Sequence, residues 1–157
     1  MIFTTLDEAL ADIKSLGTWD LDHLMKHYQI ACHYVDTLPD NINGYTIPDT
    51  RTCFINSKVE SPLFVCHHEF THVLLDQSTE PLIDASFVSN SKIESQANHG
   101  ALYVMINNYI DKCNIDPDDF NIMHFAAAYG LDSKYILDAR NIAEKILGIN
   151  IYSNSFM

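Results

Sequence analysis

The sequence predicts an α+β fold: one mostly helical domain with a small β-sheet. Apolar residues recur at helical spacing near both ends of the chain, and two short β-rich runs, 43–47 and 52–55, lie between these regions. The 157 residues contain no repeat and no Pro/Gly-rich linker, and this length suits one core. We therefore expect a single domain over 1–157, with a disordered tail at 150–157 that is rich in Ser and Asn.

The N-terminal region predicts two helices. The first covers Leu6–Leu16 and ends at Gly17. The second is expected from Asp20 to Asp36, because an apolar stripe recurs there at helical spacing: Leu21, Leu24, Tyr28, Cys32 and Val35. Leu38-Pro39-Asp40 follows and would end this helix.

A β-hairpin and then a helix are expected in the middle of the chain. Asn43–Ile47 and Thr52–Ile55 are β-rich and flank the turn signal Pro48-Asp49. Ser61-Pro62 has the form of a helix N-cap followed by Pro at the first helical position. The helix should reach about Asp76 and bury a side formed by Leu63, Cys66, Phe70, Val73 and Leu74.

The remaining chain predicts a loop and three helices. Gln77–Asn90 is polar and is expected to be a loop. Lys92–Asp111 should form a long helix, with Ile93, Ala97, Ala101, Val104 and Met105 facing inward. Asp116-Pro117 should cap a helix that Gly130 ends, and the last helix is expected from Ser133 to about Leu147.

Charge and cysteine content restrict the partners and the compartment. The formal net charge of −12 would repel a phosphate backbone, so we expect no direct binding to nucleic acid. The sequence contains no signal peptide pattern and no apolar run long enough to span a membrane. Its four cysteines are scattered, without a Cys-x-x-Cys pair, and are expected to be reduced and mostly buried. These features predict a cytoplasmic protein without a membrane partner.

The segment His68-Glu69-Phe70-Thr71-His72 contains the pattern His-Glu-x-x-His. On a helix, His68 and His72 lie one turn apart on the same face and can bind one ion. Glu69 is about 100 degrees further round, where it can reach a water on that ion and act as a general base. The pattern therefore predicts a zinc site on a helix of the zincin type, with Glu69 as the catalytic residue.

A catalytic zinc needs a third protein ligand and an open fourth position. A third histidine of the metzincin kind is excluded, because Leu75 and Ser78 occupy the positions that would hold its Gly and His. Carboxylates downstream are the alternative: Asp76, Glu80, Asp84 and Glu94. Glu94 would stand on a rigid helix, but Ser91-x-x-Glu94 is also a capping box, which needs no metal. Local sequence leaves these two roles of Glu94 open.

Over residues 20–147 the chain resembles the ImmA/IrrE family of gluzincin-like metallopeptidases. The matching segments, in order, are Leu38-Pro39 with Gly44-Tyr45, Arg51–Asn56, Phe64–Leu75, Glu94-Ser95-Gln96-Ala97-Asn98, and Ile122–Tyr135. The sequence departs from the family at Phe70-Thr71, where a small Gly often precedes the second His, and at His67, an additional imidazole. Neither departure removes a ligand.

The resemblance implies that Glu94 is the third zinc ligand, and Asn98 one turn later could hydrogen-bond to a ligand. It also implies a phage or mobile-element peptidase that cleaves or inactivates a helix-turn-helix repressor on a separate chain. The alternative is a non-proteolytic antirepressor, or a toxin–antitoxin component, that binds its partner on the same zinc scaffold. Manganese or iron would also suit this ligand set. The oxyanion-stabilising residue is left open among Tyr45, His99, Tyr103 and His124.

Overall fold

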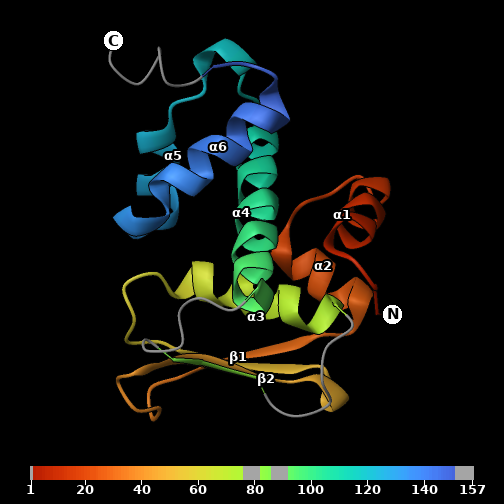
Figure 1. The fold of residues 1–157 in the computed structure, drawn as a ribbon, viewed down its shortest axis with the longest axis vertical. Helices are drawn as coiled ribbons and strands as arrows, with labels where there is room; N and C mark the ends of the chain where they lie inside the picture. Colours follow the sequence, from red (N-terminus) through yellow and green to blue (C-terminus); the bar gives the residue numbers. More distant parts are fainter. Residues whose placement is uncertain (1, 76–81, 86–91, 151–157) are drawn as a thin grey trace.

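The computed structural model describes residues 2–75, 82–85 and 92–150. A small β-sheet lies at one end of the molecule, and helix α3 (Pro62–Leu74) crosses one of its faces. Helix α4 (Lys92–Cys113) passes α3 and extends away from the sheet toward the C-terminal helices (Figure 1). The predicted α+β, mostly helical fold is confirmed. The tail expected to be disordered lies outside the described residues, apart from Asn150.

Within the described residues, the sheet has four strands in the order β1-β3-β2-β4. They are β1 (Ala31–Val35), β2 (Ile42–Ile47), β3 (Thr52–Asn56) and β4 (Leu82–Ala85). Strand β2 is antiparallel to both β3 and β4, whereas β1 is parallel to β3. The β2–β3 pair is the expected hairpin, and the short 3-10 turn η1 (Pro48–Thr50) connects its strands.

The N-terminal region contains α1 (Leu6–Ser15), as expected, and a shorter second helix than expected. The prediction of a helix from Asp20 to Asp36 is wrong beyond Tyr28, because α2 covers only Leu21–Tyr28. Gln29 adopts a left-handed conformation with a φ of 58° and ends the helix. Residues 31–35 then become strand β1, whose backbone bonds to β3 outweigh the helical spacing of its apolar side chains.

Several local expectations around α3 and α4 are also corrected. Ser61 makes no side-chain cap; its hydroxyl instead donates to the carbonyl of Gly130 at 2.5 Å. Leu63 and Ile93 were expected to be buried, but they are 36% and 42% exposed. Strand β4 lies inside the segment expected to be a loop, because its backbone gains partners from β2. The rest of that segment, 77–81 and 86–90, lies outside the described residues.

The C-terminal helices are α5 (Ile122–Tyr129) and α6 (Ile136–Leu147). Asp116-Pro117 begins only the 3-10 turn η2 (Pro117–Asp119), whereas the side chain of Asn121 caps α5. Gly130 ends α5 as expected. The turn η3 (Ser133–Tyr135) precedes α6, so the last helix is shorter than the expected Ser133–Leu147.

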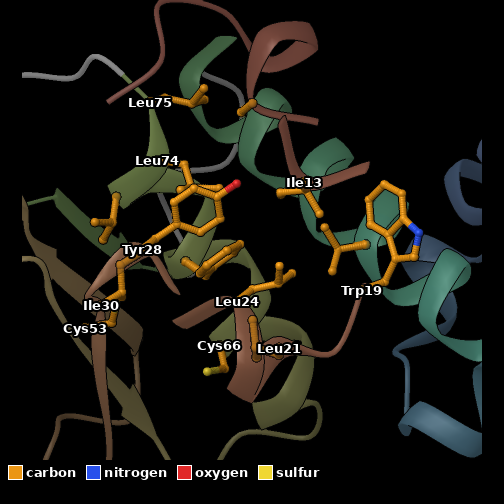
Figure 2. Close-up of a cluster of buried hydrophobic side chains, with 14 of the residues drawn as sticks. Ile13, Trp19, Leu21, Leu24, Tyr28, Ile30, Cys53, Cys66, Leu74 and Leu75 are labelled. Atoms are coloured by element: carbon orange, nitrogen blue, oxygen red, sulfur yellow. The ribbon is translucent and has the colours of Figure 1, made fainter. Parts of the chain in front are cut away.

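The apolar core has two parts. One joins α1, α2, α3 and the sheet, and includes Trp19, Leu24 and Tyr28 (Figure 2). The other joins α4, α5 and α6 around Phe125 and Met105. Helix α3 borders both parts, because Phe64 at its start belongs to the second and most of its apolar residues belong to the first. Among the described residues, no helix combines the length and the apolar character needed to cross a membrane.

Candidate metal centre

Helix α3 is enclosed by the sheet on one side and by α4 on another. Every residue from Phe64 to Leu74 is buried, including the polar ones. A buried imidazole or carboxylate is costly unless it has a partner, so the polar side chains of this helix need hydrogen-bond partners. Some of these partners are carbonyls of α3 itself, and the others come from α4 and from strand β2.

On the side facing α4, three side chains converge. The Nε2 atom of His68 lies 3.1 Å from Nε2 of His72 and 2.7 Å from Oε2 of Glu94. His72 Nε2 lies 3.3 Å from the same carboxylate oxygen. The structure therefore brings together the three residues expected as ligands. In the described part of the chain, they form a buried cluster whose donor atoms could hold one metal ion.

Asn98 fixes the state of the first histidine. Its Oδ1 lies 2.7 Å from Nδ1 of His68. An amide oxygen only accepts, so Nδ1 must carry the proton and donate. In the neutral ring, Nε2 then presents a lone pair to Glu94, one turn before Asn98 on α4. Asn98 thus has the place expected for a residue that orients a ligand.

The contact between His68 and Glu94 requires a positive charge. A lone pair on Nε2 and a carboxylate oxygen repel each other at 2.7 Å unless a proton or a cation lies between them. Burial alone would raise the pKa of Glu94, but hydrogen bonds to His68 and His72 bring that pKa down to about 2. The carboxylate is therefore held ionised beside the two rings.

The distances between the three donor atoms fit a tetrahedrally coordinated metal ion. Two atoms that each lie about 2.1 Å from a tetrahedral zinc are about 3.4 Å apart. The separations of 3.1 and 3.3 Å agree with this value, and the third, 2.7 Å, requires only a small outward shift of Glu94. Two nitrogens and one oxygen are the donor set of a common type of catalytic zinc site.

Glu69 has a different environment, on the side of α3 that faces the sheet. It is fully buried, and its Oε2 accepts a hydrogen bond from the hydroxyl of Thr46 on β2. Thr46 is also fully buried. Sequence analysis missed this residue, because Thr46 lies 23 positions before Glu69 and no local pattern connects the two.

Glycines allow close approach on both sides of α3. A Cβ at Gly44 on β2 would lie 2.8 Å from the carbonyl oxygen of Phe54 on β3 and 3.2 Å from Cγ1 of Val65 on α3. A Cβ at Gly100 on α4 would lie 2.6 Å from Cγ2 of Thr71. The strand and the helix can therefore both pack directly against the helix that carries the histidines.

The remaining candidate residues from the sequence lie outside the cluster of His68, His72 and Glu94, or outside the described residues. His67 is buried, and burial lowers its pKa to about 4 against a smaller opposing effect of its hydrogen bond to the Leu63 carbonyl. Among the oxyanion candidates, Tyr45 stacks on Phe54 and His99 stacks on Tyr103. The alternative ligands Asp76 and Glu80, and the capping residue Ser91, lie outside the described residues. For Asp84 the structure describes only the backbone, in β4.

The fold and the cluster define a helical α+β protein with a buried group of two histidines and one carboxylate that could hold a metal ion. Comparison with protein-family models, with curated proteins and with solved structures finds no match for the chain. The resemblance to the ImmA/IrrE family therefore depends on the sequence motifs alone.

Proposed function

We propose that this protein is a zinc-dependent endopeptidase of the ImmA/IrrE type, with one zinc ion per chain bound by His68, His72 and Glu94. One observation carries the proposal. Nε2 of His68 faces the Glu94 carboxylate at 2.7 Å, while its Nδ1 is committed to Asn98. A divalent cation between Nε2 of His68 and the Glu94 carboxylate would accept an electron pair from each of them at once.

Zinc suits this ligand set and the proposed reaction. Three protein ligands leave a fourth position for water or substrate, as in catalytic zinc sites. When bound, the ion supplies Lewis acidity, which polarises a peptide carbonyl and lowers the pKa of water to about 7. The neutral ligand histidines and the ionised Glu94 leave the site with one net positive charge, which suits it to a developing oxyanion.

The protein side chains have separate tasks in this proposal. Glu69 takes the proton from the attacking water and later gives it to the leaving amine. The Thr46 hydroxyl bonds to Oε2 of Glu69 and restrains the orientation of the carboxylate. Asn98 keeps the proton of His68 on Nδ1, so that Nε2 stays available as a ligand.

The proposed substrate is a separate protein, a helix-turn-helix repressor of a phage or mobile element. The net charge of −12 favours a protein partner over direct contact with DNA. Strands β1 and β4 are the edges of the sheet, and an extended peptide segment could pair with such an edge. We place this activity in the cytoplasm, where such repressors act.

The burial of the site supports a second candidate function. His68, Glu69, His72 and Glu94 are between 0% and 8% exposed, which also suits a metal that stabilises the fold. In that case the protein would be an antirepressor, or a toxin–antitoxin component, that binds its partner without cutting it. The two candidates differ in whether Glu69 is needed.

The deciding experiment mixes the zinc-loaded protein with the repressor encoded beside it and analyses the mixture by mass spectrometry. Defined repressor fragments that are absent with Glu69→Gln would support the peptidase. An intact repressor in a stable complex, with both the wild-type protein and the variant, would favour the antirepressor. Zinc content is measured for both proteins, so that loss of metal is not mistaken for loss of the base.

A further inference from the structure

Cys32 and Cys66 form a thiol pair that the proposed peptidase chemistry does not use. Cys32 lies on strand β1 and Cys66 on helix α3, 34 residues apart in sequence. Their sulfur atoms are 2.9 Å apart, and both cysteines are free. The pair therefore connects an edge strand of the sheet to the helix that carries the two histidines.

The fold brings these sulfurs together through the register of the sheet. Cys32 is opposite Cys53 in the parallel pairing of β1 with β3, so both side chains point to the face that α3 covers. A disulfide bond is about 2.05 Å long, so covalent closure needs an approach of less than about 1 Å. The two sulfurs are thus already in contact in the folded protein.

A small oxidant can reach the pair from the surface. Both cysteines line a cavity of about 330 Å³, together with Tyr34 and His67. Cys32 is partly exposed, whereas Cys66 is 2% exposed. The cavity thus gives access to the sulfur of Cys32, and Cys66 is the adjacent thiol that can resolve its oxidation.

We propose that Cys32 and Cys66 are a redox modification site at which a peroxide converts the two thiols into a disulfide. The Cys32 sulfur attacks a peroxide oxygen, the O–O bond breaks, and the departing hydroxide takes the thiol proton as water. The product is a sulfenic acid on Cys32. The Cys66 sulfur then displaces the hydroxyl group, which leaves as a second water with the Cys66 proton. Two electrons pass from the sulfurs to the peroxide.

The disulfide would join β1 to α3 and restrict the unfolded chain. The two residues are 34 positions apart in sequence. A disulfide that closes a loop of this length typically raises the melting temperature of a protein of about 150 residues by roughly 4–16 °C. Cys66 lies two residues before His68, about 200 degrees round the helix, so the disulfide would not contact the side of α3 that carries His68 and His72. This proposal does not depend on the peptidase assignment.

The test treats the folded full-length protein with hydrogen peroxide, quenches it, and alkylates it under denaturing conditions. We expect two of the four thiols to become protected and peptide mapping to find Cys32 joined to Cys66. Dithiothreitol should restore all four thiols and abolish the rise in melting temperature. Peptide mapping of the wild-type protein decides the matter even if a variant fails to fold.

Two variants serve as a matched pair. Cys113→Ser removes an exposed thiol on α4 and should leave the crosslink intact. Cys32→Ser should abolish the crosslink and leave Cys66 alkylatable. Recovery of both Cys32 and Cys66 as free thiols, or as sulfinic acids, from peroxide-treated folded protein would overturn the proposal. A crosslink that involves Cys53 or Cys113 instead would also overturn it.

Discussion

The two sides of helix α3 each hold a buried carboxylate, but in different surroundings. On the α4 side, Glu94 contacts two imidazoles, and its pKa falls to about 2. On the sheet side, Glu69 is as deeply buried, yet the partner that strand β2 provides is a neutral threonine hydroxyl. One carboxylate is thus paired with two imidazoles, whereas the other accepts a hydrogen bond from a hydroxyl group of the sheet.

This difference shows how adjacent positions of one motif acquire different chemistry. His68 and Glu69 are neighbours in sequence, but the helix directs them to different elements, about 100 degrees apart. Charge balance at the proposed metal would depend on the α4 side, where Glu94 lies. Proton transfer would depend on the sheet side, where a carboxylate can change its protonation without giving up a ligand position. The following experiments test that division.

The largest effect is expected at Glu94. Glu94→Gln keeps the shape of the side chain but removes the negative charge, so the zinc affinity should fall by about a thousandfold or more. Loss of an outer partner costs roughly 10–100-fold, so Asn98→Ala should have the smaller effect. Competition with a chromophoric chelator measures both affinities.

His68→Ala provides the control for this prediction, because it removes a ligand nitrogen and should abolish zinc binding. Full zinc content in that variant would contradict the whole metal assignment. If Glu94→Gln alone kept its zinc, the third ligand would have to be another group, and the capping-box role of Glu94 would be favoured.

The next effect is expected at Glu69, and it should separate the two sides of α3. Glu69→Gln leaves all three ligands in place, so zinc content should stay at one ion per chain. Removal of a general base typically lowers the rate by about 10²–10⁴-fold. The rate of repressor cleavage, measured at equal zinc content, tests this expectation. Undiminished cleavage would show that Glu69 is not the base.

A third prediction concerns His67, a buried imidazole that lies on neither carboxylate side. Its pKa is lowered from 6.5 to about 4 in the fold, so the unfolded chain takes up a proton first as the pH falls. The neutral His67 ring therefore contributes its full amount to the free energy of unfolding above pH 6.5, and this contribution is lost as the pH falls toward 4. It amounts to about 3 kcal/mol.

Urea unfolding of the zinc-free protein at several pH values measures this effect. His67→Gln keeps an N–H donor for the Leu63 carbonyl but cannot be protonated, so it should flatten the pH dependence. His23→Gln, at an exposed position on α2, is the matched control and should leave the pH dependence as it is in the wild type. Equal slopes in all three proteins would show that His67 is not the group responsible.

The smallest effect is expected at Thr46. Thr46→Val removes the hydroxyl that donates to Glu69, and loss of such a buried partner costs about 1–3 kcal/mol in stability. The cleavage rate should fall by about tenfold while zinc content stays unchanged, because Thr46 contacts the proposed base and none of the proposed ligands. Thr46→Ser keeps the hydroxyl and should behave nearly as the wild type. Identical behaviour of the Val and Ser variants would contradict this role.

The sequence predicted the elements whose signals are local. Helix α1, the β2–β3 hairpin, α3 and α4 follow from spacing, turn residues and length. Strand β1 was mistaken for a helix, because Cys32 and Val35 continue the helical spacing of α2 and only pairing with β3 decides their conformation. Strand β4 has four residues and exists through its partner β2, so no local pattern indicates it.

The site shows the same division. The motif itself indicated His68, Glu69 and His72, but Glu94 was chosen over its capping role only through the family resemblance. The structure places its carboxylate at the two rings, which sequence spacing alone could not decide. Thr46 and Glu69 are in contact although they are 23 positions apart in sequence, and Cys32 and Cys66 although they are 34 apart. No local sequence pattern predicts either contact.

The two glycines beside α3 limit how this protein can evolve. Gly44 and Gly100 have no room for a methyl group, because Phe54 and Thr71 would lie within 3 Å of it. A side chain at Gly44 would disturb the pairing of β2 with β3, and one at Gly100 would disturb the packing of α4 on α3. Both demands come from the fold and not from the cluster of His68, His72 and Glu94. Variants that lose this cluster should therefore still keep both glycines.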